Sequence, residues 1–181
     1  WYRHRRTFLV VSVYAVGPVD AVDALAINSR DEVYLMVFVR PTPSTGGRII
    51  VRLDANNQMV YVAGSLSTNE QKDGDVQETR IDNGRLFTSM VFDAQDNLYF
   101  TNGDAIRKIA NNQVTTVAGQ LNSVPGLTSV DGDAATASAI PNSLAVATDG
   151  TIYFSELITD KVRKVSPKGV VTTELNADDG I

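Results

Sequence analysis

The sequence predicts an all-β protein built from repeated four-stranded antiparallel sheets. Three observations support this prediction: successive segments of the chain are similar, apolar and polar residues alternate within them, and short turns rich in Asn, Pro and Gly separate them. Alternation places neighbouring side chains on opposite faces of a strand, which is typical of antiparallel sheets. We therefore expect little helix in any part of the chain.

Composition limits the classes of protein to consider. The chain has 181 residues, of which 43% are hydrophobic and 20% charged, so it is long enough to bury a sizeable core. It has no cysteine and a single histidine, His4, which excludes disulfides, thiolate zinc sites and multi-histidine metal centres. No apolar run approaches the ~20 residues that a membrane-spanning helix needs, so no membrane span is predicted.

The first expected element lies at residues 7–16, which are rich in strand-forming Val and Tyr. Basic residues from Arg3 to Arg6 precede it and small residues follow at 21–24, so a secretory signal is the second interpretation, and we favour the strand. Because the chain begins with Trp1, we expect a processed form or a part of a longer protein. The compartment stays open, with a secreted or extracellular location favoured.

Three hairpins align without gaps inside each segment. Each consists of an apolar strand, a polar turn and a second apolar strand, and the copies span residues 25–35, 90–100 and 144–154. A tyrosine holds the same position in every copy: Tyr34, Tyr99 and Tyr153. The first interval between these tyrosines is the longer one, mostly because of a proline-rich insertion at residues 40–47.

A second pair of strands follows each hairpin, so the repeating unit is a meander of four antiparallel strands. Repeated units of ~40–50 residues of this kind are typical of β-propeller blades. We predict one domain over residues 1–181, with a candidate strand of a preceding blade at 7–17 and blades at 24–64, 88–119 and 143–176.

Propellers usually close with about four to eight blades, whereas this chain supplies three. The predicted fold is therefore a β-propeller segment of about three four-stranded antiparallel blades that forms an incomplete ring. We expect additional blades, or a second copy in a homo-oligomer, to close the ring.

The last two copies also resemble a known family, the NHL repeat. The similarity covers about residues 20–176 and is carried by Val62-Ala63-Gly64, Asp73-Gly74-Asp75, Ile106-Arg107-Lys108-Ile109, Val114 to Gly119, Asp131 to Ala137, Ile140 to Val146, Asp149 to Phe154 and Val162-Arg163-Lys164-Val165. The resemblance implies a propeller. NHL repeats usually carry an aspartate after the second strand, where this sequence has Thr101-Asn102 and Ser155-Glu156, so the residues of a family site differ here.

The order of strands in a meander decides where the connections lie. Short turns such as 93–97 and 148–151 should share one face of the propeller, and the connections at 65–87 and 120–142 should share the other with the insertion at 40–47. Long loops on a rigid scaffold are where binding residues usually lie. We expect function on the long-loop face.

The long-loop face is net acidic, and the whole chain has a formal charge of −5. Some NHL propellers bind RNA through a basic face, so this charge argues against nucleic acid as a partner. A protein or peptide partner fits better. We predict a non-enzymatic protein-interaction or structural module that presents a loop-rich acidic propeller face, with no cofactor.

The candidate binding residues are polar side chains on or near these connections: Asp73, Asp75, Asn102, Asp131, Asp133, Asn142 and Glu156. The Asp-Gly-Asp sequences at 73–75 and 131–133 carry oxygen ligands of the kind calcium prefers, but a full calcium-loop spacing is absent. We favour the interpretation that Asp-Gly forms a tight turn and that its neighbour caps a loop amide. No metal site is predicted.

An enzyme is the alternative. Pro141-Asn142, Asp149-Gly150 and Phe154-Ser155-Glu156 also resemble gluconolactonase-like six-bladed propellers, which implies a metal-assisted hydrolase or lactonase with Asn102, Asn142 and Glu156 as candidates. The simpler interpretation, which we favour, is that Asn142 caps the start of a strand and Glu156 is a solvated loop charge. Enzymatic activity stays open, with a non-enzyme favoured and no catalytic residue assigned.

Two repeated basic pairs, Arg107-Lys108 and Arg163-Lys164, lie within expected strands. Neighbours in a strand point to opposite faces, so neither pair can form a single basic patch. We expect a structural use, in which the stem of one side chain covers the blade while its charge reaches water.

Overall fold

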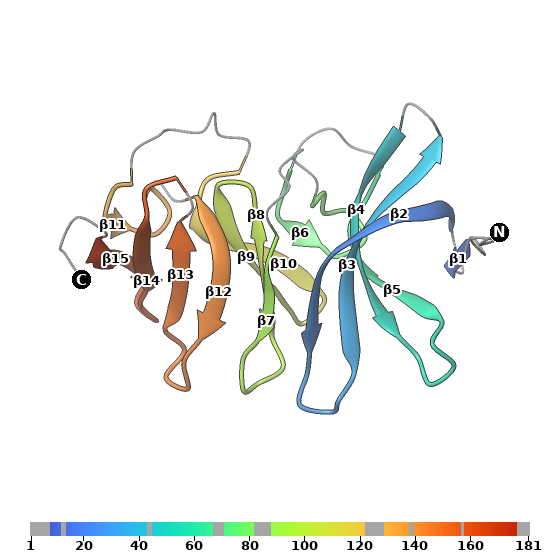
Figure 1. The fold of residues 1–181 in the computed structure, drawn as a ribbon, viewed down its shortest axis with the longest axis horizontal. Helices are drawn as coiled ribbons and strands as arrows, with labels where there is room; N and C mark the ends of the chain where they lie inside the picture. The colour runs from blue at the N-terminus through green and yellow to red at the C-terminus, as the bar shows by residue number, and fades with distance from the viewer. Residues whose placement is uncertain are drawn as a thin grey trace.

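A computed structural model describes the chain over residues 8–11, 14–42, 45–66, 71–81, 88–121, 129–137, 140–156 and 158–176. The basic segment at residues 3–6 lies outside the described residues. Every regular element of the described chain is a β-strand, and the strands form three antiparallel sheets that lie side by side (Figure 1). No helix among the described residues is long and apolar enough to cross a membrane.

The first sheet has the strand order β1-β2-β3-β4-β5. Its strands are β1 (Phe8–Val11), β2 (Tyr14–Ile27), β3 (Val33–Thr42), β4 (Thr45–Leu53) and β5 (Met59–Ala63). Strands that follow one another in the sequence are neighbours in the sheet, as in a meander. β1 also contacts β5, so the N-terminal strand approaches the far edge of its own sheet.

The second and third sheets share one topology. The second has the order β6-β10-β9-β8-β7, with β6 (Gly74–Asp75), β7 (Met90–Phe92), β8 (Leu98–Asn102), β9 (Ala105–Ala110) and β10 (Gln113–Gly119). The third has the order β11-β15-β14-β13-β12, with β11 (Gly132–Asp133), β12 (Pro141–Val146), β13 (Ile152–Glu156), β14 (Lys161–Val165) and β15 (Val170–Asn176). Each is a four-stranded meander with a two-residue strand from the preceding connection at its edge.

This architecture confirms the predicted fold class. The chain is all-β, its three sheets repeat one meander, and the sheets do not close into a ring (Figure 1). It is an incomplete propeller of three blades. The exact blade boundaries given above stay a prediction.

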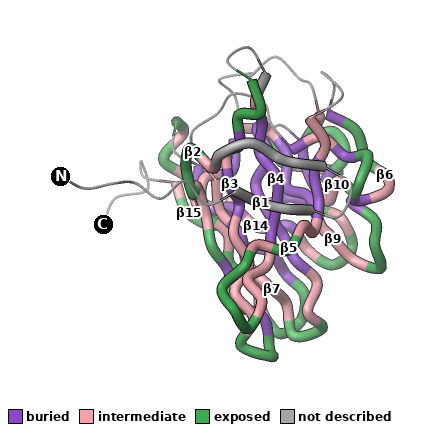
Figure 2. The backbone as a smooth tube through the Cα atoms, turned by 90° about the vertical axis from the view of Figure 1, so that its right-hand side faces the viewer, coloured by how far each residue is buried: buried purple, intermediate pink, exposed green. Residues whose placement is uncertain are grey.

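Apolar cores join consecutive sheets. Between the first and second sheets pack Ala26, Met36, Ile50, Ala63, Val76, Ile81, Met90, Leu98, Phe100 and Val114. Between the second and third pack Tyr99, Ile106, Ala118, Ala134, Ala137, Ile152, Phe154, Val165 and Val171. Figure 2 shows buried positions along the middle of the strands and exposed positions at the hairpin tips. The sheets are thus stabilised against one another by burial of apolar surface.

The repeated tyrosines hold equivalent places in the three sheets. Tyr34 meets Phe92 of the second sheet edge to face, with ring centroids 4.9 Å apart. Tyr99 is 7% exposed in the core shared with the third sheet. Tyr153 is 37% exposed, because no further sheet of the described residues packs against it. The first two tyrosines therefore face the next sheet, and the third faces outward.

The turns that join the first two long strands of each hairpin, at 28–32, 93–97 and 147–151, lie on one side of the row of sheets, as predicted (Figure 1). The described part of the connection before the second sheet reaches the short β9–β10 turn, because Asp75 pairs with Gln113 and the Val76 N–H donates to the carbonyl oxygen of Asn112. The equivalent turn residues Asp31, Asp96 and Gly150 all have positive φ, of 59°, 59° and 86°. Asp and Gly are among the residues that adopt this region most readily. The connections at 65–87 and 120–142 lie partly outside the described residues.

The first sheet differs from the prediction at the proline-rich insertion. Residues 40–47 were expected to form a loop, but most of them continue β3 and β4, which still pair through Val39↔Gly47 and Thr42↔Thr45. β2 is also long, because it pairs with β1 and then with β3. The expected N-terminal strand at 7–16 is therefore divided between β1 and the start of β2.

A third apolar core lies on the outer face of the first sheet. Val37, Val39, Ile49 and Val51 are buried there, each 2% exposed or less. Their burial accompanies the approach of β1 to β5 on the far edge of the same sheet. Part of the face that a preceding blade would contact is thus covered by the chain itself.

Candidate functional site

Two buried arginines organise the predicted site residues. Arg107 on β9 and Arg163 on β14 are each 0% exposed and hold the same position in successive sheets. Arg107 pairs in register with Phe100 and lies 5.8 Å from the centroid of its ring, and Arg163 lies 5.6 Å from the ring centroid of its register partner Phe154. The aromatic face therefore attracts each guanidinium by a cation–π interaction.

An aspartate of the connection before each sheet completes the ion pair. Asp73 accepts hydrogen bonds from Arg107 Nη2 at 3.0 Å and Nε at 3.2 Å, and its other oxygen accepts one from the Thr116 backbone N–H at 2.7 Å. In the next sheet, Asp131 accepts from Arg163 Nη2 at 3.0 Å and from the Thr173 backbone N–H at 2.9 Å. Each aspartate thus links the connection, the arginine and the outermost long strand.

Backbone carbonyls and further polar side chains satisfy the remaining donors. Arg107 donates to the carbonyl oxygens of Lys72 and Arg80 at 2.5 and 2.8 Å and to Thr79 Oγ1 at 2.6 Å. Arg163 donates to the carbonyl oxygen of Val130 at 2.7 Å. We call each arginine with these partners an arginine clamp, because it holds the base of a long connection against its sheet.

The clamps correct the expectation for the repeated basic pairs. The use is structural, as predicted, but the arginine charge does not reach water. Most partners of each arginine lie on the connection before its sheet, 27–35 positions earlier in the chain, which alternation within a strand cannot reveal. The neighbouring Lys108 lies on the opposite face, with its Nζ 5.3 Å from the ring centroid of Tyr99.

The structure also corrects the expectation for Glu156. It is 3% exposed at the end of β13, where a solvated loop charge was expected. Its carboxylate accepts hydrogen bonds from Arg163 Nη1 at 2.8 Å, the Ile140 backbone N–H at 3.2 Å, Thr159 Oγ1 at 2.5 Å and the Ser129 hydroxyl. Burial alone would raise the pKa of Glu156, but these hydroxyl donors and Arg163 outweigh it and hold the pKa below its usual value.

Asn102 occupies the position in the second sheet that Glu156 occupies in the third. Its Oδ1 accepts a hydrogen bond from Arg107 Nη1 at 3.2 Å, while its buried Nδ2 finds no partner among the described residues. The clamp of the second sheet therefore has one carboxylate for its arginine, and the clamp of the third sheet has two. Burial lowers the pKa of Arg107, opposed by its pairing with Asp73.

The second aspartate of each Asp-Gly-Asp sequence caps a turn. Asp75 Oδ1 accepts from the Gln77 backbone N–H at 2.8 Å, and Asp133 Oδ1 accepts from the Ala135 backbone N–H at 2.9 Å. The intervening glycines have φ of 136° and 137°, which other residues rarely adopt. The expected capping of a loop amide by the second aspartate is confirmed, but the tight turn lies after the Asp-Gly-Asp sequence, because Gly74–Asp75 and Gly132–Asp133 form the short strands β6 and β11.

The predicted site residues therefore fall into separate groups. Asp73 and Asn102 both accept hydrogen bonds from Arg107, and Asp131 and Glu156 both accept hydrogen bonds from Arg163. Asn142 lies partly buried in β12, beside a register shift between Pro141 and Ser143. The described residues hold no cluster of three or more Asp, Glu or His side chains that could bind a metal ion. Binding of a partner by these seven residues stays a prediction.

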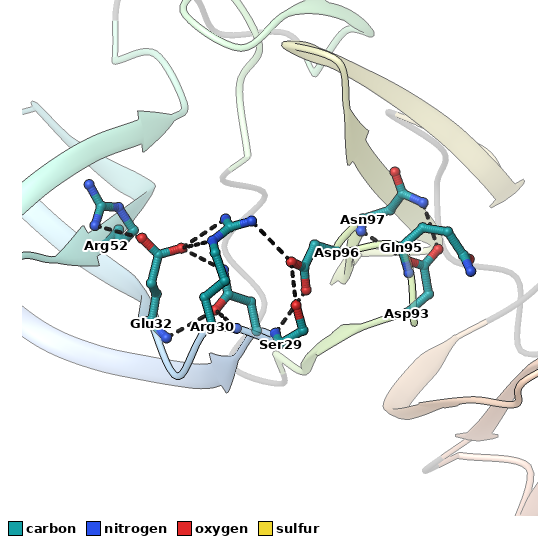
Figure 3. A network of polar contacts seen from close by, with 9 residues as sticks. Ser29, Arg30, Glu32, Arg52, Asp93, Gln95, Asp96 and Asn97 are labelled. Atoms are coloured by element: carbon teal, nitrogen blue, oxygen red, sulfur yellow. Dashed lines mark hydrogen bonds and ion pairs between the residues drawn. The ribbon is translucent and has the colours of Figure 1, made fainter.

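A polar network on the short-turn side was not predicted from the sequence (Figure 3). Asp96 accepts from the Ser29 backbone N–H at 2.8 Å, from its hydroxyl at 2.7 Å and from Arg30 Nη1 at 3.2 Å. Arg30 also pairs with Glu32, which pairs with Arg52. The hydrogen bonds from Ser29 lower the pKa of Asp96. This network connects the turns of the first two sheets, and only a comparison of charges at equivalent turn positions could have indicated it.

The comparisons with known proteins support the fold but identify no family for the chain. No known protein family matches the chain, and no curated protein sequence matches it. Solved structures do. A protein of unknown function from Bacteroides thetaiotaomicron is similar over 87% of this chain and 48% of its own, with 16% identity and a TM-score of 0.55.

Two further structures are similar. An auxiliary nutrient binding protein from Bacteroides ovatus matches 86% of this chain and 47% of its own, with 15% identity and a TM-score of 0.51. A virginiamycin B lyase from Staphylococcus aureus matches 87% of this chain and 69% of its own, with 12% identity and a TM-score of 0.38. The chain spans about half the length of the first two structures.

Proposed function

We propose that the chain is part of an NHL-like propeller that acts as a protein-interaction module and binds a basic protein or peptide through its acidic connections. The observation that carries the proposal is the repetition of one rigid acidic element. In both sheets an Asp-Gly-Asp sequence is held to the sheet by an arginine clamp, and its acidic side chains stay partly open to solvent.

The exposed fractions support this interpretation. The side chains of Asp73 and Asp131 are 39% and 47% exposed although each pairs with a buried arginine. Glu78, on the same connection as Asp73, is 69% exposed and pairs with Lys72. Carboxylates that are already ordered lose little conformational entropy when a cationic partner binds, which favours association.

The clamps also favour a binding module over the hydrolase. A hydrolase of the kind considered above needs an amide and a carboxylate free to hold a metal or a base. Here Asn102 and Glu156 belong to different sheets, and each accepts a hydrogen bond from the buried arginine of its own sheet. Asn142 lies in the bulge of β12 opposite Glu156 and Ser155, but no hydrogen bond of the described residues joins its side chain to Asn102 or Glu156.

Binding of a basic peptide tests the proposal. We expect a fluorescent Lys- and Arg-rich peptide to bind the chain with an affinity that falls as salt rises, and a Glu-rich peptide of equal length not to bind. Replacing the turn-capping aspartates by Asp75→Asn and Asp133→Asn together should weaken binding about three- to tenfold, because the charges of an exposed and a partly buried carboxylate are lost.

A matched control uses a turn-capping aspartate that lies outside the long connections. Asp54 caps the β4–β5 turn by accepting from the Asn56 and Gln58 backbone N–H groups, each at 2.8 Å. Asp54→Asn should leave peptide affinity unchanged. Equal loss of affinity in Asp54→Asn and in the double variant, or no salt-dependent binding at all, would count against the proposal.

A further inference from the structure

Large apolar side chains are exposed on one face of β2. Val22, Leu25 and Ile27 are 55%, 61% and 55% exposed, and we call them the β2 patch. Leu25 pairs in register with Leu35, which packs against the core on the outer face of the first sheet. The β2 patch therefore lies on the outer face of the first sheet, away from the second sheet. It lies beside the part of the outer face that the chain itself covers.

The internal repeat shows what covers such a face. Aligned with Leu25 are Met90 and Leu144, and aligned with Ile27 are Phe92 and Val146. All four of these equivalents pack in cores against the preceding sheet, and Met90 is only 7% exposed. The β2 patch thus has the chemistry of a contact between blades but no blade against it in the single chain.

The third sheet presents the complementary face at the other end of the row. Tyr153 and Leu175 are 37% and 45% exposed, and Val162 lies beside them in register with Ser155 and Leu175. The equivalent residues of the second sheet, Tyr99, Ile106 and Ala118, are 7%, 0% and 0% exposed in the core shared with the third sheet. We call Tyr153, Val162 and Leu175 the outer patch.

We infer that two copies of the chain pair head to tail, with the outer patch of each copy on the β2 patch of the other. Within the chain, each sheet packs a face equivalent to the outer patch against a face of the next sheet that is equivalent to the β2 patch. In a second copy, the outer patch is therefore the surface that fits the β2 patch, and the β2 patch is the surface that fits the outer patch. A heterologous contact that repeats once closes a two-copy ring of six blades. This inference deepens the proposed function, because the ring would be the scaffold that presents the acidic connections.

Sedimentation analysis over a range of concentrations tests the pairing. We expect the chain to have twice its single-chain mass of 19.5 kDa. Leu25→Asp should reduce the mass to that of one chain, and so should Tyr153→Asp, because each places a charge inside the contact. Val60→Asp is the matched control: Val60 is 39% exposed on β5 and pairs with Arg52, away from both patches, so this variant should stay paired.

Mixing the two disrupted variants distinguishes head-to-tail pairing from pairing of like faces. The Leu25→Asp chain keeps an intact outer patch and the Tyr153→Asp chain keeps an intact β2 patch, so the mixture should regain a species of doubled mass that neither variant forms alone. Recovery also shows that both variants are folded.

Several outcomes would overturn the inference. One is a wild-type chain that has the mass of a single chain at all concentrations, which is expected if another protein supplies the missing blades. The others are growth beyond two copies and loss of pairing in only one of the two variants. Its failure is distinguishable from failure of the proposed function. Peptide binding should persist in Leu25→Asp, and doubled mass should persist in the variant with Asp75→Asn and Asp133→Asn.

Discussion

At the scale of single residues, the molecule relies on buried charge more than its composition suggests. Arg107 and Arg163 are fully buried, yet each donates to a carboxylate, to carbonyl oxygens and to other polar side chains. Burying a guanidinium is unfavourable unless its donors are satisfied, and loss of one partner leaves an expensive buried charge. The clamps should therefore be sensitive to changes of a single carboxylate.

The pH dependence of stability should report Glu156. Its pKa in the folded chain lies below its usual value of 4.5, so the ionised form stabilises the fold. This stabilisation is fully present above the unfolded-state pKa and is lost as pH falls through the folded-state pKa. Glu156→Gln should lower the free energy of unfolding at pH 7 by about 2–3 kcal/mol and flatten its dependence on pH below about 5.

Urea denaturation at a series of pH values measures this effect. Asp131, whose pKa is also lowered on balance by hydrogen bonds from Thr173 and Arg163 against the effect of burial, remains in the variant. The difference between the two proteins therefore reports Glu156 together with its coupling to Asp131 through Arg163. Glu174→Gln, which removes one partner of the surface pair with Lys164, is the control and should leave the pH dependence unaltered. Identical curves for wild type and Glu156→Gln would contradict the account.

At the scale of elements, the end of one strand is held tightly against the next turn. Gly119 ends β10 with φ of 81°, and its N–H donates to the carbonyl oxygen of Ala134 at 2.9 Å. A Cβ at this position would lie 1.9 Å from the carbonyl oxygen of Asp104. This close approach, and not only the positive φ, requires glycine here.

Two alanine substitutions separate strain from overlap. Gly169 has a similar φ of 75°, but a Cβ there would meet nothing within 4 Å. Gly169→Ala should cost about 1–2 kcal/mol for the left-handed conformation, and Gly119→Ala about 2–5 kcal/mol because overlap is added. The free energies of unfolding in urea provide the measurement, and equal losses in the two variants would show that the approach to Asp104 relaxes without cost.

At the scale of the whole molecule, each sheet packs only against its neighbours in the row (Figure 1). Stability in such repeats is approximately the sum of the intrinsic stabilities of the units and the contacts between them. A defect in one core should therefore be felt most strongly by the two sheets that share it.

Hydrogen exchange can test this locality. Met36 is 0% exposed in the core between the first and second sheets, so Met36→Ala should cost about 2–5 kcal/mol and reduce amide protection more in β3 and β8 than in β14. Ile152→Ala, in the other core, should reverse the order, with the largest loss in β8 and β14. Uniform loss of protection across all three sheets in both variants would show that the row unfolds as a single unit.

The repeat and the alternation within it determine the fold class, because both express the period of a strand and the burial of one face against a neighbour. They place Tyr34, Tyr99 and Tyr153 at equivalent positions of the three sheets, put the hairpin turns on one side of the row and indicate that the second aspartate of each Asp-Gly-Asp sequence caps a loop amide. These are properties that residues close in the sequence impose on one another.

Only the tertiary structure decides the use of the charged side chains. Arg107 and Asp73 are 34 positions apart, and Arg163 and Asp131 are 32 apart, so their pairing depends on where a long connection meets a sheet. Burial of Glu156, extension of β3 and β4 through residues 40–47, and the Asp96 network between two turns depend likewise on packing of distant segments. A pattern of neighbouring residues carries no information about such contacts, because their free energy arises only when the sheets have assembled.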